Sequence, residues 1–184
     1  MPEAGFGPRL HARLAGGLRI APFAGLAIIT CTALAVSVIR PPRAPTFIWN
    51  ASGSMPMGLY AVDRGARIFP GDTVAARLAP GAENLAAVRQ YLPHGLPVIK
   101  YAAGVPGDRV CSQGERVTVN GRFAASRKAV DAKGRALPSW QGCLSLSRRS
   151  YFLLGRDARS FDGRYFGPSG EDARIVKARL IWRR

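Results

Sequence analysis

Short apolar or alternating stretches separated by turns run through most of the chain and predict a mainly β structure. The clearest alternation lies in Ala173–Trp182, where one face is wholly apolar from Val176 onward and the other includes Lys177 and Arg179. In Arg116–Phe123 the pair Asn120-Gly121 follows Val-Thr-Val, which is typical of a tight hairpin turn. Further strands are expected at Phe47–Trp49, Leu59–Asp63, Thr73–Leu78, Leu96–Ala103 and Ser150–Leu154.

Two segments of the body depart from the strand pattern. Ala82–Tyr91 carries alanine and leucine without breakers and is followed by Pro93, which predicts one short helix. Ala124–Trp140 is polar and has no clear periodicity, so we expect a loop. The pattern therefore predicts a β-rich domain with a single short helix.

The stretch Ile20–Ile39 contains twenty residues without a charge and predicts a transmembrane helix. About 20 apolar residues, each rising about 1.5 Å, span a hydrocarbon core of roughly 30 Å. The alternative is a cleaved signal peptide, whose apolar region is usually about 7–15 residues long and ends at a small-residue cleavage site. Because Arg40-Pro41-Pro42-Arg43 follows at once, a retained signal anchor is the favoured interpretation.

The expected domain organisation is a basic N-terminus at 1–19, the anchor at 20–39, a proline-rich collar at 40–46 and a body at 47–184. Three arginines precede the anchor and two follow it closely. The positive-inside rule then places the N-terminus in the cytoplasm and the body on the periplasmic side of the inner membrane. The body would thus start close to the bilayer.

The charge balance narrows the partners that the chain can have. Among 184 residues, 27 lysines and arginines outweigh 11 acidic residues, for a net charge of +16. Such an excess suits nucleic acid or an anionic membrane surface. No helix-turn-helix pattern, zinc-ligand spacing or RNP-like aromatic run is present, so we expect the membrane and no nucleic acid.

Two residues stand out as candidates for chemistry. Ser54 lies in Ala51–Gly58, a turn rich in glycine and proline that can present a hydroxyl at the surface, although a flexible loop would have the same composition. Lys100 lies in an otherwise uncharged strand, where burial would lower its pKa and let it take a proton from a serine hydroxyl. The alternative is an edge-strand lysine whose ammonium reaches solvent.

The third candidate is the polar loop Gly155–Pro168, which is edged with aromatic residues. Ser160 and Asp162 could orient an ammonium there, and Arg164 could pair with Asp162. The alternative is a solvated surface loop.

Histidine and metal chemistry are not favoured by the residue placement. His11 precedes the anchor and His94 lies in a turn, and neither has an evident acidic partner for a Ser-His-Asp triad. Two histidines and three cysteines in these settings make a poor metal site. We therefore expect no metal and no cofactor.

In their order along the chain, these stretches resemble the boxes of the type I signal peptidase family, whose members are serine peptidases with a Ser/Lys dyad. Ser52–Pro56 resembles the nucleophile box, Val98–Asp108 the lysine box with its Gly-x-Pro-Gly-Asp ending, and Gly155–Gly167 the last box. Within the family, Ser54–Tyr60 and Ser160–Pro168 look most like the conjugative-transfer peptidases of the TraF type, which mature pilin subunits.

The resemblance implies a signal-peptidase-like catalytic β domain with Ser54 as nucleophile and Lys100 as general base. Ser52 and the backbone N–H of Ser54 would form the oxyanion hole. Supporting roles are implied for Ser160, Asp162 and Arg164.

The implied activity is cleavage of signal or leader peptides, or of pilin precursors, after small residues. A general leader peptidase for many preproteins and a non-enzymatic membrane-anchored scaffold of a secretion complex are the alternatives.

Three departures from the family pattern bear on these roles. Arg156 stands where the larger family has aspartate, and Gly163 stands where serine is usual, which leaves the local support of Lys100 open. Met57-Gly58 stands where leader peptidases have threonine and leucine, which favours the pilin-type interpretation.

Cys111 and Cys143 both lie in the body that we expect to be exported, where disulfides persist, whereas Cys31 lies within the anchor. We therefore predict a Cys111–Cys143 bridge that closes the polar excursion between them. Two separately buried thiols are the alternative.

Overall fold

The computed structural model describes residues 46–184. The basic N-terminus at 1–19, the anchor at 20–39, most of the collar and Cys31 lie outside the described residues. Among residues 46–184, no helix is both long enough and apolar enough to cross a membrane.

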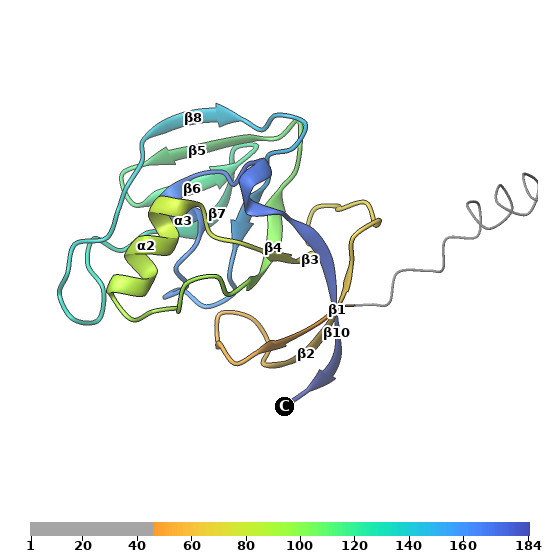
Figure 1. The fold of residues 1–184 in the computed structure, drawn as a ribbon. Helices are drawn as coiled ribbons and strands as arrows, with labels where there is room; N and C mark the ends of the chain where they lie inside the picture. The colour runs from red at the N-terminus through yellow and green to blue at the C-terminus, as the bar shows by residue number, and fades with distance from the viewer. Residues whose placement is uncertain (1–45) are drawn as a thin grey trace, which may run out of the picture. The chain divides into compact units, whose positions relative to one another are not determined.

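Two antiparallel sheets contain most of the regular secondary structure of the described chain and confirm the prediction of a mainly β domain (Figure 1). The larger sheet has six strands in the order β1-β2-β10-β3-β4-β9, and the smaller has four in the order β7-β6-β5-β8. The strand bounds are β1 Thr46–Asn50, β2 Gly58–Asp63, β3 Thr73–Ala76, β4 Val98–Gly104, β5 Arg109–Gln113, β6 Arg116–Val119, β7 Arg122–Ser126, β8 Gly142–Ser145, β9 Phe152–Leu154 and β10 Val176–Arg183.

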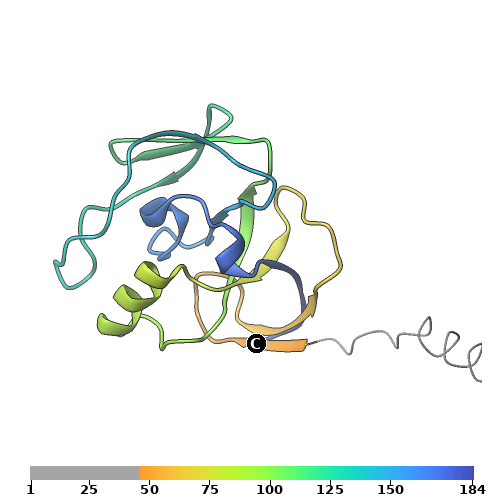
Figure 2. The same ribbon diagram turned by 45° about the horizontal axis from the view of Figure 1, so that its top comes forward.

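The smaller sheet and the β1 edge of the larger sheet lie at opposite ends of the body. Figures 1 and 2 show the smaller sheet at one end and strands β1, β2 and β10 at the opposite end, beside the C-terminus. Because β10 pairs with both β2 and β3, the last strand of the chain lies in the middle of the larger sheet.

The helical elements differ in detail from those that the sequence predicts. The main helix, α2, spans Pro80–Val88 and so begins two residues earlier and ends three residues earlier than expected. Its proline lies at the helix start, where the missing N–H costs no hydrogen bond, and Gln90 takes a positive φ of 60° beyond the end. A one-turn helix, α3 (Gly163–Phe166), and a 3-10 turn, Glu171–Ala173, were not predicted.

Strand β4 is covered on both faces, and this position determines the environment of the candidate lysine. Ile99 faces a core cluster that includes Met55 and Tyr60. Ala102 faces a second cluster formed with Val74 and its neighbours. Lys100 shares β4 with these residues and retains only 4% exposure. A lysine in this strand is therefore removed from solvent by the fold itself.

Gly58, the last residue of the predicted serine turn, is required by the packing at the start of β2. Its φ is +150°, and a Cβ built there would lie 2.1 Å from the carbonyl oxygen of Trp182 in β10. Any side chain would force β2 and β10 apart. The glycine therefore fixes where the turn ends and the sheet begins.

The smaller sheet contains the predicted disulfide. Cys111 of β5 lies directly opposite Cys143 of β8, and their sulfurs are bonded. The bridge joins positions 32 residues apart and closes the segment that contains β6, β7 and the loop after them. The predicted pairing is confirmed.

Removing this disulfide is expected to lower stability without changing the fold. In the chain-entropy model, a bridge across a loop of this size contributes about 3–4 kcal/mol. We expect Cys111→Ser/Cys143→Ser to unfold at a lower urea concentration than the wild type. Thiol labelling of the denatured, unreduced wild type should modify one cysteine, whereas labelling of three would contradict the bridge.

Candidate active site

Ser54 lies in the turn between β1 and β2. Asn50 holds this turn at the point where it leaves β1. Asn50 is the last residue of β1 and is 7% exposed. Its side-chain amide bonds to the backbone of Ser52, Met55 and Pro56, on both sides of Ser54. These hydrogen bonds hold the turn in place, and Ser54 lies half-buried within it.

Lys100 reaches Ser54 from strand β4 of the larger sheet. Its Nζ lies 3.2 Å from the Oγ of Ser54 and donates a 2.7 Å hydrogen bond to the Oγ of Ser160. The two serines lie 46 and 60 residues from the lysine in the sequence. The fold therefore brings together three residues that the sequence singled out.

Burial dominates the electrostatics of this lysine. Desolvation lowers the pKa of Lys100 from its ordinary value of 10.5 to about 8, Asp162 opposes this shift, and Arg164 adds to it. About a tenth of Lys100 is consequently neutral at pH 7, far more than for an ordinary lysine. A neutral amine 3.2 Å from a hydroxyl can act as its base.

Asp162 and Arg164 form a buried pair that shapes the loop after β9. The guanidinium donates to both carboxylate oxygens of Asp162, over 2.8 and 3.1 Å, and to the carbonyls of Ala158 and Gly155. Asp162 also accepts from the N–H of Gly155 over 2.7 Å. These bonds close the loop into a ring, and Ser160 lies inside it facing Lys100.

Gly155 lets this loop approach the serine turn closely. A Cβ at Gly155 would lie 2.2 Å from the Oγ of Ser160 and 3.0 Å from the carbonyl oxygen of Ser54. The next residue, Arg156, donates its backbone N–H to that same carbonyl over 2.8 Å. The loop and the serine turn are therefore joined by backbone contact.

The side chain of Ser52 points at Ser54. Its Oγ lies 3.1 Å from the Oγ of Ser54 and accepts from the Ser54 N–H over 3.3 Å. The two donors expected for an oxyanion hole thus lie side by side at the edge of the site. Here they bond to each other.

Comparison with known proteins identifies the family of the chain. The model of the family described as "Signal peptidase, peptidase S26" matches residues 18–183. The chain belongs to this signal peptidase family. The conjugal transfer protein TraF of Agrobacterium fabrum (strain C58 / ATCC 33970) is 32% identical over 143 residues, covering 72% of this chain and 80% of that protein. The TraF of Agrobacterium tumefaciens (strain 15955) is 32% identical over 145 residues, with the same coverage.

Two departures of the chain from the usual family pattern now have a structural account. The side chain of Arg156 is exposed, with its guanidinium 5.7 Å from the ring centre of Tyr101, and only its backbone contacts Ser54. At Gly163 a Cβ would lie 2.8 Å from the carbonyl oxygen of Leu153, so a serine does not fit. Support of Lys100 therefore comes from Ser160 and the ring around it.

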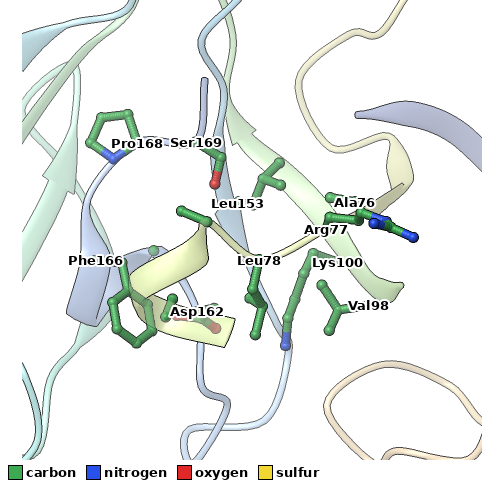
Figure 3. Close-up of a pocket in the computed structure, with 13 residues that line it drawn as sticks. Ala76, Arg77, Leu78, Val98, Lys100, Leu153, Asp162, Phe166, Pro168 and Ser169 are labelled. Atoms are coloured by element: carbon green, nitrogen blue, oxygen red, sulfur yellow. The ribbon is translucent and has the colours of Figure 1, made fainter. Parts of the chain in front are cut away.

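A small cavity of about 50 Å³ lies along the stem of Lys100. Figure 3 shows the lysine running through it, with Val98 on one side and Asp162 on the other. Its largely apolar lining includes Leu153 of β9 and Ala82 of α2. Within residues 46–184, no cluster of three His, Cys, Asp or Glu residues could hold a metal ion.

Sequence reasoning missed two residues that hold the serine turn. Asn50 precedes the nucleophile box and carries no motif signal of its own. Tyr60 ends the stretch that resembles the TraF type, but its role was not anticipated: its hydroxyl donates to the carbonyl of Pro56 over 2.7 Å. A polar residue at the end of an apolar strand, directly before a turn, was the available signal for Asn50.

Replacing Lys100 by methionine should stabilise the protein in a pH-dependent way. Because the folded pKa of about 8 lies below the ordinary 10.5, the unfolded chain binds more protons between these values and wild-type stability rises with pH there. We expect Lys100→Met to gain on the order of 3 kcal/mol at pH 7, falling to about 1 kcal/mol at pH 10.

Urea unfolding of the wild type and of Lys100→Met at these two pH values measures the gain in the free energy of unfolding. The comparison cancels the titration of every other group, so a gain that is equal at both pH values would contradict the lowered pKa.

Proposed function

We propose that this signal peptidase is a membrane-bound serine endopeptidase that removes a leader peptide from a pilin precursor in conjugative transfer. The observation that carries the proposal is the buried amine of Lys100 lying 3.2 Å from the hydroxyl of Ser54. Similarity to two conjugal transfer proteins supports a pilin precursor over a broad range of preproteins as the substrate. We further propose small residues directly before the cleaved bond.

In the first step, neutral Lys100 takes the proton of Ser54, and the Ser54 oxygen attacks the carbonyl carbon of the cleaved peptide bond. Ser160 accepts one N–H of Lys100 over 2.7 Å, which leaves the nitrogen lone pair free to face Ser54. The ring formed by Asp162 and Arg164 holds Ser160 in this position. The protonated lysine then gives its proton to the leaving amine, and an acyl-enzyme remains.

The tetrahedral oxyanion would be stabilised by the N–H of Ser54 and the hydroxyl of Ser52. Both groups lie within 3.3 Å of each other, so a carbonyl oxygen can receive both bonds once the Ser52 hydroxyl rotates. One such donor typically contributes about 2.7–4 kcal/mol of transition-state stabilisation. Water, activated by Lys100, then cleaves the acyl-enzyme and releases the product.

The outward face of β1, β2 and β10 supports the proposed membrane location. Phe47, Trp49 and Trp182 are 54%, 48% and 56% exposed, and the two tryptophan rings stack with centroids 5.5 Å apart. Trp49, Leu59 and Trp182 lie in register across the three strands. Tryptophan prefers the interface between lipid and water, and β1 begins only six residues after Arg40 in the sequence.

Removing either member of the proposed dyad should abolish cleavage. Ser54→Ala lacks the nucleophile, and Lys100→Ala lacks the base, so we expect a loss of at least about 10³-fold in kcat for each. Cleavage of an internally quenched peptide with alanine before the cleaved bond measures this in detergent-solubilised full-length protein.

Wild-type kcat should rise with pH, with a midpoint at about pH 8, because protonated Lys100 cannot accept the serine proton. Folding of both variants is checked by their urea transitions. Cleavage by Lys100→Ala at the wild-type rate would refute the dyad.

The aromatic face should lie in the bilayer interface of reconstituted full-length protein. The chain has three tryptophans, so Trp140→Phe leaves Trp49 and Trp182 as reporters. We expect lipids brominated along their acyl chains to quench the fluorescence of this variant. The matched control, Trp49→Phe/Trp182→Phe, keeps only Trp140 and should not be quenched. Equal quenching of both variants would contradict this orientation.

A further inference from the structure

A single buried amide bridges both sides of the serine turn. The Oδ1 of Asn50 accepts from the N–H of Ser52 over 3.1 Å. Its Nδ2 faces the carbonyls of Ser52, Met55 and Pro56 at 3.0, 3.2 and 3.0 Å. An amide offers one acceptor oxygen and two N–H donors, so the three carbonyls share two hydrogens. Ser54 lies between the residues that are held.

The contacts determine the orientation of this amide. If its oxygen and nitrogen exchanged places, the oxygen of Asn50 would face three carbonyl oxygens and its nitrogen would face the N–H of Ser52. Only asparagine, of the residues this size, presents one acceptor and two donors from a planar group. An aspartate at this position would keep the bond from the Ser52 N–H but would set a carboxylate oxygen against the three carbonyls.

We propose that Asn50 is a positioning residue that holds the Ser54 turn in the geometry needed for attack on the cleaved bond. The inference rests on the proposed function. Asn50 acts through Ser54. The Oγ of Ser54 must stay 3.2 Å from the Nζ of Lys100 while the N–H of Ser54 stays available to the oxyanion. A displacement of about 1 Å in such a geometry can cost about 10²-fold in rate.

The effect of Asn50 is separable from that of Lys100. The lysine is buried by β4 and its neighbours, and its hydrogen bonds go to Ser54 and Ser160. Loss of the amide should therefore lower kcat and leave the pH midpoint of kcat unchanged. A role in overall stability alone would lower the folded fraction instead and leave the rate per folded molecule as it was.

Asn120 provides a matched control in the smaller sheet. Its amide joins the turn after β6 to the start of β5, accepting from the N–H of Arg109 and donating to Asp108, each over 2.8 Å. Asn120 follows β6 and takes a positive φ of 51°, so Asn120→Ala loses stability as well as two hydrogen bonds. It should lower stability without lowering kcat per folded molecule.

The experiment compares Asn50→Asp, Asn50→Ser and Asn120→Ala with the wild type, as full-length protein in detergent micelles. With the quenched peptide, we expect both Asn50 variants to lose about 10²-fold in kcat, with KM changed less than about threefold. Their pH midpoint should match that of the wild type. Hydrogen exchange should accelerate in residues 51–57 of the Asn50 variants and stay unchanged there in Asn120→Ala.

Two results would overturn the inference: wild-type kcat in Asn50→Asp, or unchanged exchange in residues 51–57. A kcat loss that Asn120→Ala reproduces at equal folded fraction would also overturn it. Failure of the proposed function looks different, because the wild type would then not cleave, or Ser54→Ala would cleave equally well. That result removes the catalytic meaning of Asn50 together with the function.

Discussion

The burial of one amine is the constraint on which this site depends. Removing a lysine from water disfavours its charged form, and this lowers the pKa of Lys100 to about 8. Strand β4 is covered on both faces and so keeps the lysine buried at a loss of folding stability. The Ser160 hydroxyl and the nearby Asp162 carboxylate offset part of this loss. A fully paired lysine would cost less stability, but its higher pKa would leave almost no neutral amine at pH 7 to act as a base. Stability and the proposed chemistry therefore place opposite demands on the same nitrogen.

The second constraint is space, because three chain segments must meet around this nitrogen. Gly155 brings the loop after β9 against the carbonyl of Ser54, and a Cβ there would also lie 2.7 Å from the Cβ of Ser160. Gly163 lets α3 start against the backbone of Leu153. The hydrogen bonds of Asp162 and Arg164 close the loop between the two glycines. The departure at Gly163 from the usual serine is thus a matter of packing, and the lysine keeps a hydroxyl partner from the same loop.

Much of this could be predicted from the sequence, because alternation and turn residues identify strands locally. The hairpin at Asn120-Gly121 and the uncharged strand around Lys100 are such local signals. The position of β10 between β2 and β3 could not be predicted, since it depends on pairing across more than a hundred residues. The role of Asn50 was missed for a related reason. The hydrogen-bond partners of Asn50 are backbone groups. Because nearly every residue type has these groups, the amino-acid sequence does not reveal which residues provide them.

The same hairpin carries both the aromatic face and the serine turn, and this links the proposed location to the proposed chemistry. Trp49 directs its ring outward, and the next residue, Asn50, directs its amide into the turn, because successive residues of a strand point to opposite faces. A bilayer contact at Trp49 would therefore set the height of Ser54 above the lipid within a few ångströms. A leader peptide leaving the bilayer as an extended chain would meet Ser54 at that height. With the proposed bilayer contact, suitable substrates would themselves be held in the membrane, with a cleavage site only a short distance beyond the apolar segment.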